Sequence, residues 1–371
     1  MARHSSSPSL WTRAQAGVLL VAVLVLSVPH QAESLPADAA LPGTDASPAP
    51  AMQTMAAAPA ARAQEADPQD VASFFPGIKG DLTKLTWAHA VNSRDLLAKS
   101  LNDSGIMMLE ADVVLGTTPE SPNQVPVMGH PPMNTSDLSL QEFLRSVVTH
   151  NTDNNATRKG VKLDFKSIGV YEKAIDSLKQ NFAGVPDFPV WLNADILPGP
   201  VNSTNTPVDA ARFLAKAKAE YPYLMLSLGW TTRWGKALGN ETVPTAFAKY
   251  NEQTVKSMTD ALDAAQITQP ITYAVRAAFV ANSLDELKML LNETHQASGK
   301  ATLTVWSSDE TDIVNVAQLK NNILAIGKDR VFLDVGEELA KQLDLASSAL
   351  STCASVVTTL LACAMVLFRA L

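Results

Sequence analysis

The chain has 371 residues and a formal net charge of −8 at pH 7, with a sequence pI near 5.3. This length allows one large α/β domain with appended segments. The negative charge argues against nucleic acid or an anionic membrane as an electrostatic partner. Cys353 and Cys363 are the only cysteines, and both lie near the C-terminus. We therefore expect a folded part that relies on its core rather than on a disulfide.

The two ends of the chain differ in composition from its middle. Residues 1–32 predict a secretory signal peptide, with arginines ahead of a short apolar run. Residues 33–70 are rich in alanine and proline and predict a disordered linker. Residues 346–371 form an apolar tail, which predicts a transmembrane helix or a GPI-anchor signal. For the first segment, the alternative is an uncleaved signal anchor. For the tail, the alternative is a final helix packed on the folded domain. We expect that domain to span residues 71–345.

Strand-like and helix-like patterns alternate through this middle part. Short runs of apolar residues predict strands, and apolar residues repeating every three or four positions predict helices. The predicted strand–helix pairs are 85–91 with 94–101, 106–115 with 140–148, 161–166 with 171–182, 190–196 with 210–221, 224–230 with 252–265, 271–280 with 283–292, 301–306 with 316–326, and 331–335 with 337–343. A proline-rich loop is expected before 140, and a capping box from Ser283 to Glu286. Eight such units are the number that closes a (β/α)₈ or TIM barrel.

Three successive predicted strands place polar side chains on one face. Residues two apart in a strand share a face. The polar groups that share faces are Glu110 with Asp112, Lys162 with Asp164 and Lys166, and Asn193 with Asp195. Carboxylates buried side by side are costly unless a cation binds among them. We therefore expect these residues to form the floor of an active site at the carboxyl ends of the strands.

The carboxylates predict a metal site. Glu110, Asp112 and Asp164 come from two adjacent predicted strands. Hard oxygen ligands suit Mg²⁺ or Ca²⁺, with water or substrate phosphate completing the coordination. The alternative is a salt-bridge network with Lys162 and Lys166, which requires no metal.

Two histidines and a lysine are the candidates for catalysis. His89 ends the first predicted strand and His130 follows the second, and imidazole groups suit acid–base work near neutral pH. Lys166 is placed to stabilise negative charge on a phosphoryl oxygen. The other candidates at strand ends, which we expect to line the substrate pocket, are Asn193, Asp195, Trp230, Arg276 and Trp306. For the tryptophans, a place in the core is the alternative.

Several of these residues lie in segments that occur together in one family. The segments are WAHAVNS at 87–93, MLEADV at 108–113, GHPP at 129–132, KLDFKS at 162–167, WLNADI at 191–196 and SLGWTT at 227–232. Over residues 80–340 the chain resembles the menorin family. That family is similar in turn to the phospholipase-C-like phosphodiesterase TIM barrels, which include glycerophosphodiester phosphodiesterases and sphingomyelinase-D-like spider phospholipases.

The resemblance implies a role for each matching residue. It implies that a divalent metal is held by Glu110, Asp112 and Asp164. It implies that His89 and His130 form the acid–base pair, with Lys166 beside the phosphate. The substrate would be a small-molecule or lipid phosphodiester, attacked by water or by a hydroxyl of the substrate itself.

The chain departs from the glycerophosphodiester enzymes beside both histidines. Those enzymes have Arg-Gly after the first histidine, where this chain has Ala90-Val91, and Asp after the second, where it has Pro131. Menorins are also associated with extracellular adhesion and neurite patterning. A catalytically silent extracellular ligand with protein partners is therefore the second hypothesis. The third is a carbohydrate-active barrel that uses two of its carboxylates, drawn from Glu110, Asp112, Asp164 and Asp195.

We expect export through the secretory pathway to an extracellular or cell-surface location. The glycosylation motifs agree with this location. Asn-x-Ser/Thr sequons begin at Asn102, Asn134, Asn155, Asn202, Asn240 and Asn292. Such motifs are acceptors for N-linked glycans in exported proteins. We therefore expect a glycoprotein held at the membrane by its C-terminal tail.

Overall fold

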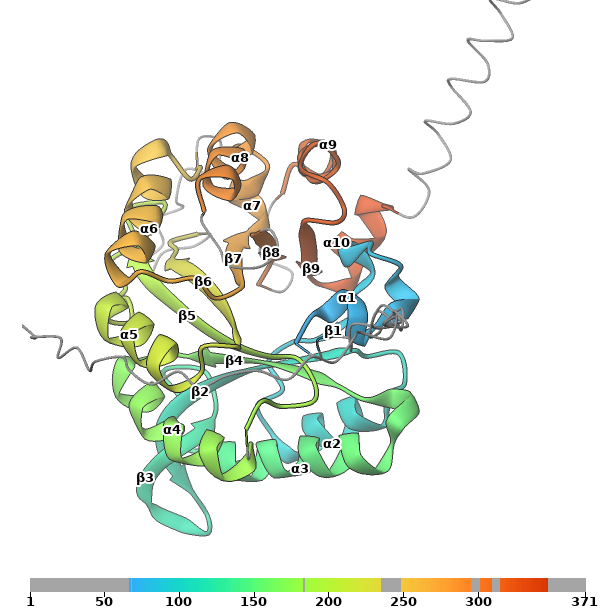
Figure 1. The fold of residues 1–371 in the computed structure, drawn as a ribbon, viewed down its shortest axis with the longest axis vertical. Helices are drawn as coiled ribbons and strands as arrows, with labels where there is room; N and C mark the ends of the chain where they lie inside the picture. The colour runs from blue at the N-terminus through green and yellow to red at the C-terminus, as the bar shows by residue number, and fades with distance from the viewer. Residues whose placement is uncertain are drawn as a thin grey trace, which may run out of the picture. The chain divides into compact units, whose positions relative to one another are not determined.

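The computed structural model describes residues 67, 69–182, 184–234, 248–294, 301–308 and 314–345. Eight parallel strands lie in the order β1–β2–β4–β5–β6–β7–β8–β9, with helices outside the nearly closed ring (Figure 1). The predicted (β/α)₈ barrel is confirmed. Among these residues, no helix is both long enough and apolar enough to cross a membrane. The expected signal peptide, nearly all of the linker and the apolar tail lie outside the described residues.

The strands and helices alternate along the chain as predicted. The strands of the ring are β1 Trp87–Ala88, β2 Met108–Thr118, β4 Gly160–Phe165, β5 Val190–Pro198, β6 Met225–Thr231, β7 Ile271–Arg276, β8 Thr302–Trp306 and β9 Val331–Asp334. The helices are α1 Val71–Phe74, α2 Arg94–Asn102, α3 Leu140–Asp153, α4 Ile168–Asn181, α5 Ala210–Glu220, α6 Glu252–Ala265, α7 Ala277–Val280, α8 Leu284–Glu293, α9 Val316–Ile326 and α10 Glu337–Leu343. Side-chain N-caps fix where many of these helices begin. The capping residues are Ser93, Ser139, Ser167, Asp209, Asn251 and Asn315.

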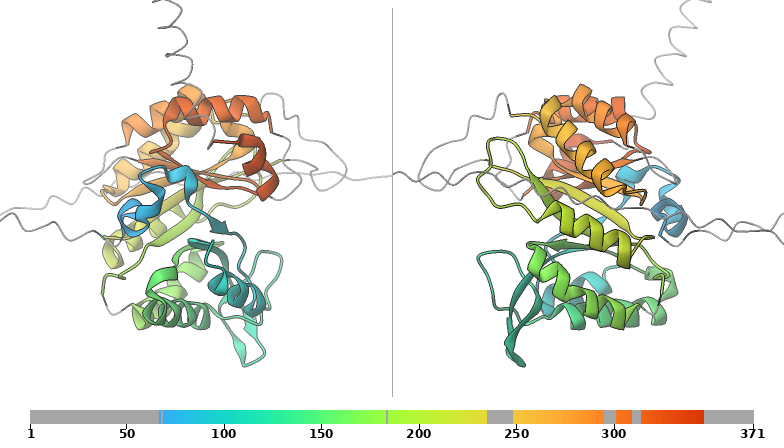
Figure 2. Two further views of the ribbon diagram at one scale, coloured as in Figure 1. Left: turned by 90° about the vertical axis from the view of Figure 1, so that its right-hand side faces the viewer. Right: turned by 60° about the vertical axis from the view of Figure 1, so that its left-hand side comes forward.

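A strand lies where the sequence predicted a proline-rich loop. β3, Ser121–Met128, pairs antiparallel with the far part of β2. The two strands form a hairpin that extends beyond the neighbouring helices and strands (Figure 2). Pro122 and Pro126 argued against a strand, but an edge strand tolerates proline because one side of its backbone has no partner strand.

Two other predicted features were wrong in detail. The strand predicted to run to residue 280 ends at Arg276, and the apolar run after it forms the short helix α7. The capping box at Ser283 does not form. The Ser283 hydroxyl instead donates to the Phe279 carbonyl and accepts the Tyr250 N–H. It therefore joins two segments of chain rather than capping α8.

Aromatic rings fill the amino-terminal end of the barrel. The Trp191 ring centroid lies 5.4 Å from that of Trp87 and 4.9 Å from that of Phe332. Beneath them pack buried side chains of the N-terminal segment 69–85, namely Val71, Ile78, Leu82 and Leu85. The segment is fastened to the barrel where the Leu82 N–H donates to the Lys328 carbonyl at 2.8 Å. Because this end is packed, the polar groups gather toward the other one.

Candidate functional site

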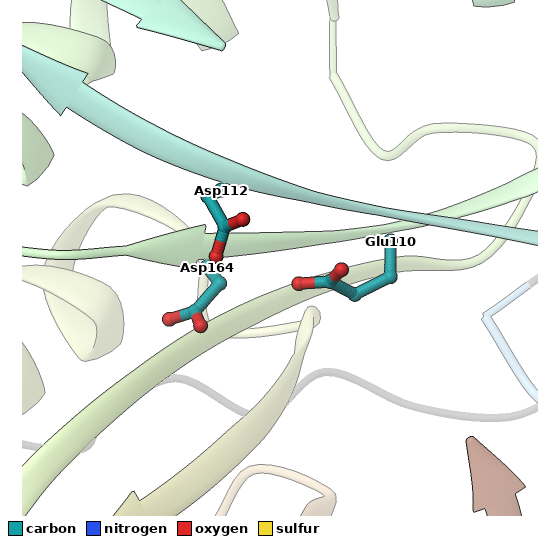
Figure 3. Close-up of side chains that lie close together, drawn as sticks. All are labelled: Glu110, Asp112 and Asp164. Atoms are coloured by element: carbon teal, nitrogen blue, oxygen red, sulfur yellow. The ribbon is translucent and has the colours of Figure 1, made fainter. Parts of the chain in front are cut away.

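The register of two parallel strands brings the three predicted carboxylates together. Asp112 on β2 lies opposite Asp164 on β4, and Glu110 lies two residues earlier on the same face of β2. One ligand oxygen from each lies within 4.8 Å of the others. Figure 3 shows the three carboxyl groups turned toward one space. Oxygen donors at this separation suit a divalent cation such as Mg²⁺ or Ca²⁺.

Lys166 follows β4 and reaches two of these carboxylates. Its Nζ lies 2.7 Å from Asp112 Oδ1 and also bonds Asp164 Oδ2. Burial lowers the pKa of Lys166, but Asp164 and Asp112 outweigh it and raise that pKa well above its ordinary value. Burial raises the pKa of Asp112, but the charge of Lys166 outweighs burial, so the pKa of Asp112 lies below its ordinary value. Lys166 is therefore a fixed positive charge beside the cluster.

His89 is held by an acidic group from the last strand. Its Nδ1 lies 3.0 Å from Asp334 Oδ1 and 3.4 Å from Glu110 Oε2. Burial lowers the pKa of His89, but these two carboxylates outweigh it and raise the pKa to about 9. His89 is therefore protonated at neutral pH. With Nδ1–H donated to Asp334, the reactive position is Nε2.

Asp334 is also paired with a lysine inside the barrel. Lys162 Nζ lies 2.6 Å from Asp334 Oδ2, with side chains only 5% and 1% exposed. Burial raises the pKa of Asp334, but Lys162 and His89 outweigh it and hold that pKa well below its usual range. Burial raises the pKa of Glu110 to about 7. The sequence placed Lys162 on the polar face of its strand, but neither Lys162 nor Asp334 was predicted to act on His89.

His130 lies at the end of the hairpin, beside β2. It follows β3, not the strand expected, and the Gly129 N–H donates to the Asp112 carbonyl at 2.9 Å. This backbone contact places His130 one residue beyond a hydrogen bond to β2, and its side chain is exposed. His130 Nδ1 lies 2.8 Å from the Pro131 carbonyl oxygen, which can only accept. The proton is therefore on Nδ1 in the neutral ring, and Nε2 is left as an acceptor.

The predicted pocket residues divide between the barrel mouth and its core. The guanidinium of Arg276 lies 5.0 Å from the Trp306 ring centroid and 5.9 Å from that of Trp234. Trp234 was not among the pocket residues predicted from the sequence. Trp230 is not at the mouth. It is 1% exposed, and its Nε1 donates to the Thr254 carbonyl of α6. Trp230 is therefore a core residue between the barrel and its helices.

The two polar residues of β5 lie at different depths. Asn193 is buried, and its Oδ1 accepts the Ser227 hydroxyl at 2.6 Å. Asp195 lies nearer the strand end, and burial, followed by the charge of Asp164, raises its pKa to about 7. A Cβ at position 229 would lie 2.3 Å from Asp195 Oδ1. Gly229 therefore leaves room for this carboxyl group.

Comparison with known proteins gives the family. A model of the Menorin N-terminal domain matches residues 81–340. Protein FAM151B of Homo sapiens is 35% identical over 259 residues, which make up 69% of this chain and 84% of that protein. Among solved structures, an Oleispira antarctica phosphodiesterase in complex with the product sn-glycerol-3-phosphate covers 70% of this chain and 96% of its own, at 13% identity and a TM-score of 0.40. A likeness that distant says nothing of this chain's activity. The family match and the 35% identity together show that the chain belongs to the menorin family.

Proposed function

We propose that this chain is a divalent-metal-dependent phosphodiesterase that acts on small or lipid phosphodiesters. The observation that carries the proposal is the meeting of three carboxylates, a lysine and His89 at one end of the barrel, with His130 at the end of the neighbouring strand β3. Glu110, Asp112 and Asp164 would hold the metal. A bound divalent cation supplies charge stabilisation to phosphoryl oxygens.

The two histidines differ in the hydrogen bond made by Nδ1, and this supports a separate role for each. His130 Nε2, an acceptor in the neutral ring, takes the proton from the attacking hydroxyl as its oxygen bonds to phosphorus. His89, protonated at neutral pH, donates from Nε2 to the leaving oxygen as the other P–O bond breaks. Lys166 faces the developing charge on the phosphoryl oxygens. The proton lost by His89 is restored from solvent.

We also propose that the protein is exported and glycosylated and acts at the cell surface. The apolar pattern near each terminus supports this. The sequon asparagines within the described residues are all exposed and thus accessible to a glycosyltransferase, and they are Asn102, Asn134, Asn155, Asn202 and Asn292. Treatment of the secreted protein with an N-glycosidase is expected to increase its gel mobility. Unchanged mobility would contradict glycosylation.

A catalytically silent binding protein is the second candidate, and one observation favours it. Lys166 already pairs with Asp112 and Asp164. A cluster neutralised by its own lysine does not need a metal to be stable. In that case the mouth of the barrel would be a rigid surface for an extracellular partner protein.

Calorimetric titration of the purified protein with Mg²⁺, Ca²⁺ and Mn²⁺ separates the two candidates. We expect binding by the wild type and a loss of more than about 100-fold in affinity in Asp164→Asn, because removing a ligand should cost at least as much as removing a ligand's hydrogen-bond partner. Asp260→Asn is the control, since Asp260 lies on the exposed face of α6. Metal-dependent turnover of a glycerophosphodiester or lysophospholipid would complete the case. Absence of metal binding by the wild type would favour the silent binding protein.

A further inference from the structure

The loop that joins β1 to α2 holds two of the three carboxylates by hydrogen bonds. Asn92 Nδ2–H donates to Asp112 Oδ2 at 2.7 Å, and the Asp112 N–H donates to Asn92 Oδ1 at 2.9 Å. Two positions earlier, the Ala90 N–H donates to Glu110 Oε2 at 2.9 Å. These contacts join a loop to β2 at positions 20 residues further along the chain.

The two hydrogen bonds of Asn92 fix both the strand and its side chain. The carboxylate of Asp112 is held from opposite sides, with Oδ2 bonded to Asn92 and Oδ1 to Lys166. Rotation of the carboxyl group would break one or both contacts. The Asn92 amide thus determines which way the carboxylate faces before any cation arrives.

The loop itself is shaped for these contacts. Ala90 has φ of +54°, a left-handed conformation that is unfavourable for a residue with a Cβ. In this conformation its N–H reaches Glu110, while the Val91 N–H donates to the Glu110 carbonyl at 2.8 Å. The Ser136 hydroxyl contacts the Asn92 carbonyl from the hairpin side. The loop is therefore tied to β2 and to the chain that carries His130.

We propose that Asn92 is a positioning residue that sets the metal affinity of the site by orienting Asp112. The proposal rests on the proposed function, since it supposes that Asp112 is a metal ligand. It adds a residue that touches neither metal nor substrate. Loss of a hydrogen bond to a metal ligand typically lowers metal affinity by about 10–100-fold.

The test compares two substitutions in the same loop of the full-length protein. Asn92→Ala removes both hydrogen bonds to Asp112. Ser93→Ala is the matched control, because the Ser93 hydroxyl accepts the Leu96 N–H as the N-cap of α2 and touches no carboxylate of the cluster. Mn²⁺ affinity is measured by calorimetry, the Mn²⁺ environment by electron paramagnetic resonance, and folding by thermal unfolding without metal.

We expect Asn92→Ala to weaken Mn²⁺ binding by about 10–100-fold and to broaden the Mn²⁺ spectrum. Ser93→Ala should lower the unfolding temperature, but its Mn²⁺ affinity and Mn²⁺ spectrum should match those of the wild type. Equal loss of affinity in the two variants would assign Asn92 a structural role only and overturn the proposal, as would unchanged affinity in Asn92→Ala. Absence of binding by the wild type would instead refute the metal-dependent function, and this proposal with it.

Discussion

Asp334, the last residue of β9, accepts hydrogen bonds from two positively charged side chains. Lys162 Nζ lies 2.6 Å from one oxygen, and His89 Nδ1 lies 3.0 Å from the other. The buried charges of Lys162 and Asp334 are tolerated because they are paired, and water cannot replace a lost partner there. This carboxylate therefore links the stability of the barrel to the orientation of a candidate catalytic group.

Asp334→Asn is expected to lower the free energy of unfolding by about 3–5 kcal/mol, because it leaves Lys162 buried without a counter-charge. Urea denaturation followed by circular dichroism measures this. Asp260→Asn removes the partner of Lys256, where both side chains are more than half exposed, and should cost less than about 1 kcal/mol. Similar losses in the two variants would mean that the buried pair contributes no more than a surface pair.

Side-chain parity explains which site residues the sequence could predict. Glu110 and Asp112 share the inner face because a strand repeats every two residues, and this needs no knowledge of the fold. The same parity argues against the prediction that Trp230 lines the substrate pocket. Trp230 shares its face with Leu228, which is buried toward the helices, whereas Gly229 between them faces the barrel interior beside Asp195. Asn92 lies in a loop, where no periodicity exists to indicate its contact with Asp112.

Among the elements, the N-terminal segment 69–85 depends on ion pairs as well as on apolar packing. Asp81 Oδ2 lies 2.8 Å from Lys328 Nζ and 3.5 Å from Lys84 Nζ. Burial raises the pKa of Asp81, but Lys328 and the Thr83 hydroxyl outweigh it, so the pKa lies below its ordinary value of 3.8. A carboxyl group with a depressed pKa stabilises the folded state above its ordinary pKa. The contribution disappears as the pH falls through the lower, folded-state value.

Asp81→Asn is therefore expected to destabilise the protein by up to about 1 kcal/mol near neutral pH, and by progressively less as the pH falls below about 4. Urea unfolding of variant and wild type at several pH values measures the difference. Asp153→Asn, at an exposed position at the end of α3, is the control. A difference that stays constant down to about pH 2 would show that the charge of Asp81 is not the cause.

The elements that were predicted wrongly from the sequence were missed for one common physical reason. Proline normally excludes a strand, but β3 is an edge strand, and edge position is a property of the assembled sheet. The residues after Arg276 are apolar and fit a strand or a buried helix equally well. Ser283 has the residues of a capping box nearby, yet its hydroxyl is taken by Phe279 and Tyr250. In each case the tertiary contact decided what the local pattern left open.

At the scale of the molecule, the barrel was predictable because eight strand–helix units follow one another in order. The ring order β1–β2–β4–β5–β6–β7–β8–β9 keeps sequence neighbours adjacent, apart from the hairpin strand β3. Consecutive parallel strands joined by helices have few alternative arrangements. The packing of segment 69–85 beneath the barrel could not be read from the same pattern, because it joins residues far apart in sequence.

Metal binding to the folded barrel is expected to raise its unfolding temperature by several degrees. A ligand at about 100 times its dissociation constant stabilises the folded state by about 2.7 kcal/mol when the unfolded chain does not bind it. Calorimetric melting with Mn²⁺, and again after a chelator is added, measures the rise and its reversal. Asp164→Asn should melt at the same temperature with and without Mn²⁺. An equal rise in that variant would place the metal elsewhere.

The contact between His89 and Asp334 also bears on the order in which parts of the site form during synthesis. The two residues are 245 positions apart, so His89 leaves the ribosome long before its partner exists. Contacts of such separation form late, because the chain between them must first be brought together. A nascent chain can thus assemble the carboxylate cluster of β2 and β4 while the histidine beside it still lacks its hydrogen bond to Asp334. Release of the last strand would complete the barrel and orient His89 in one event.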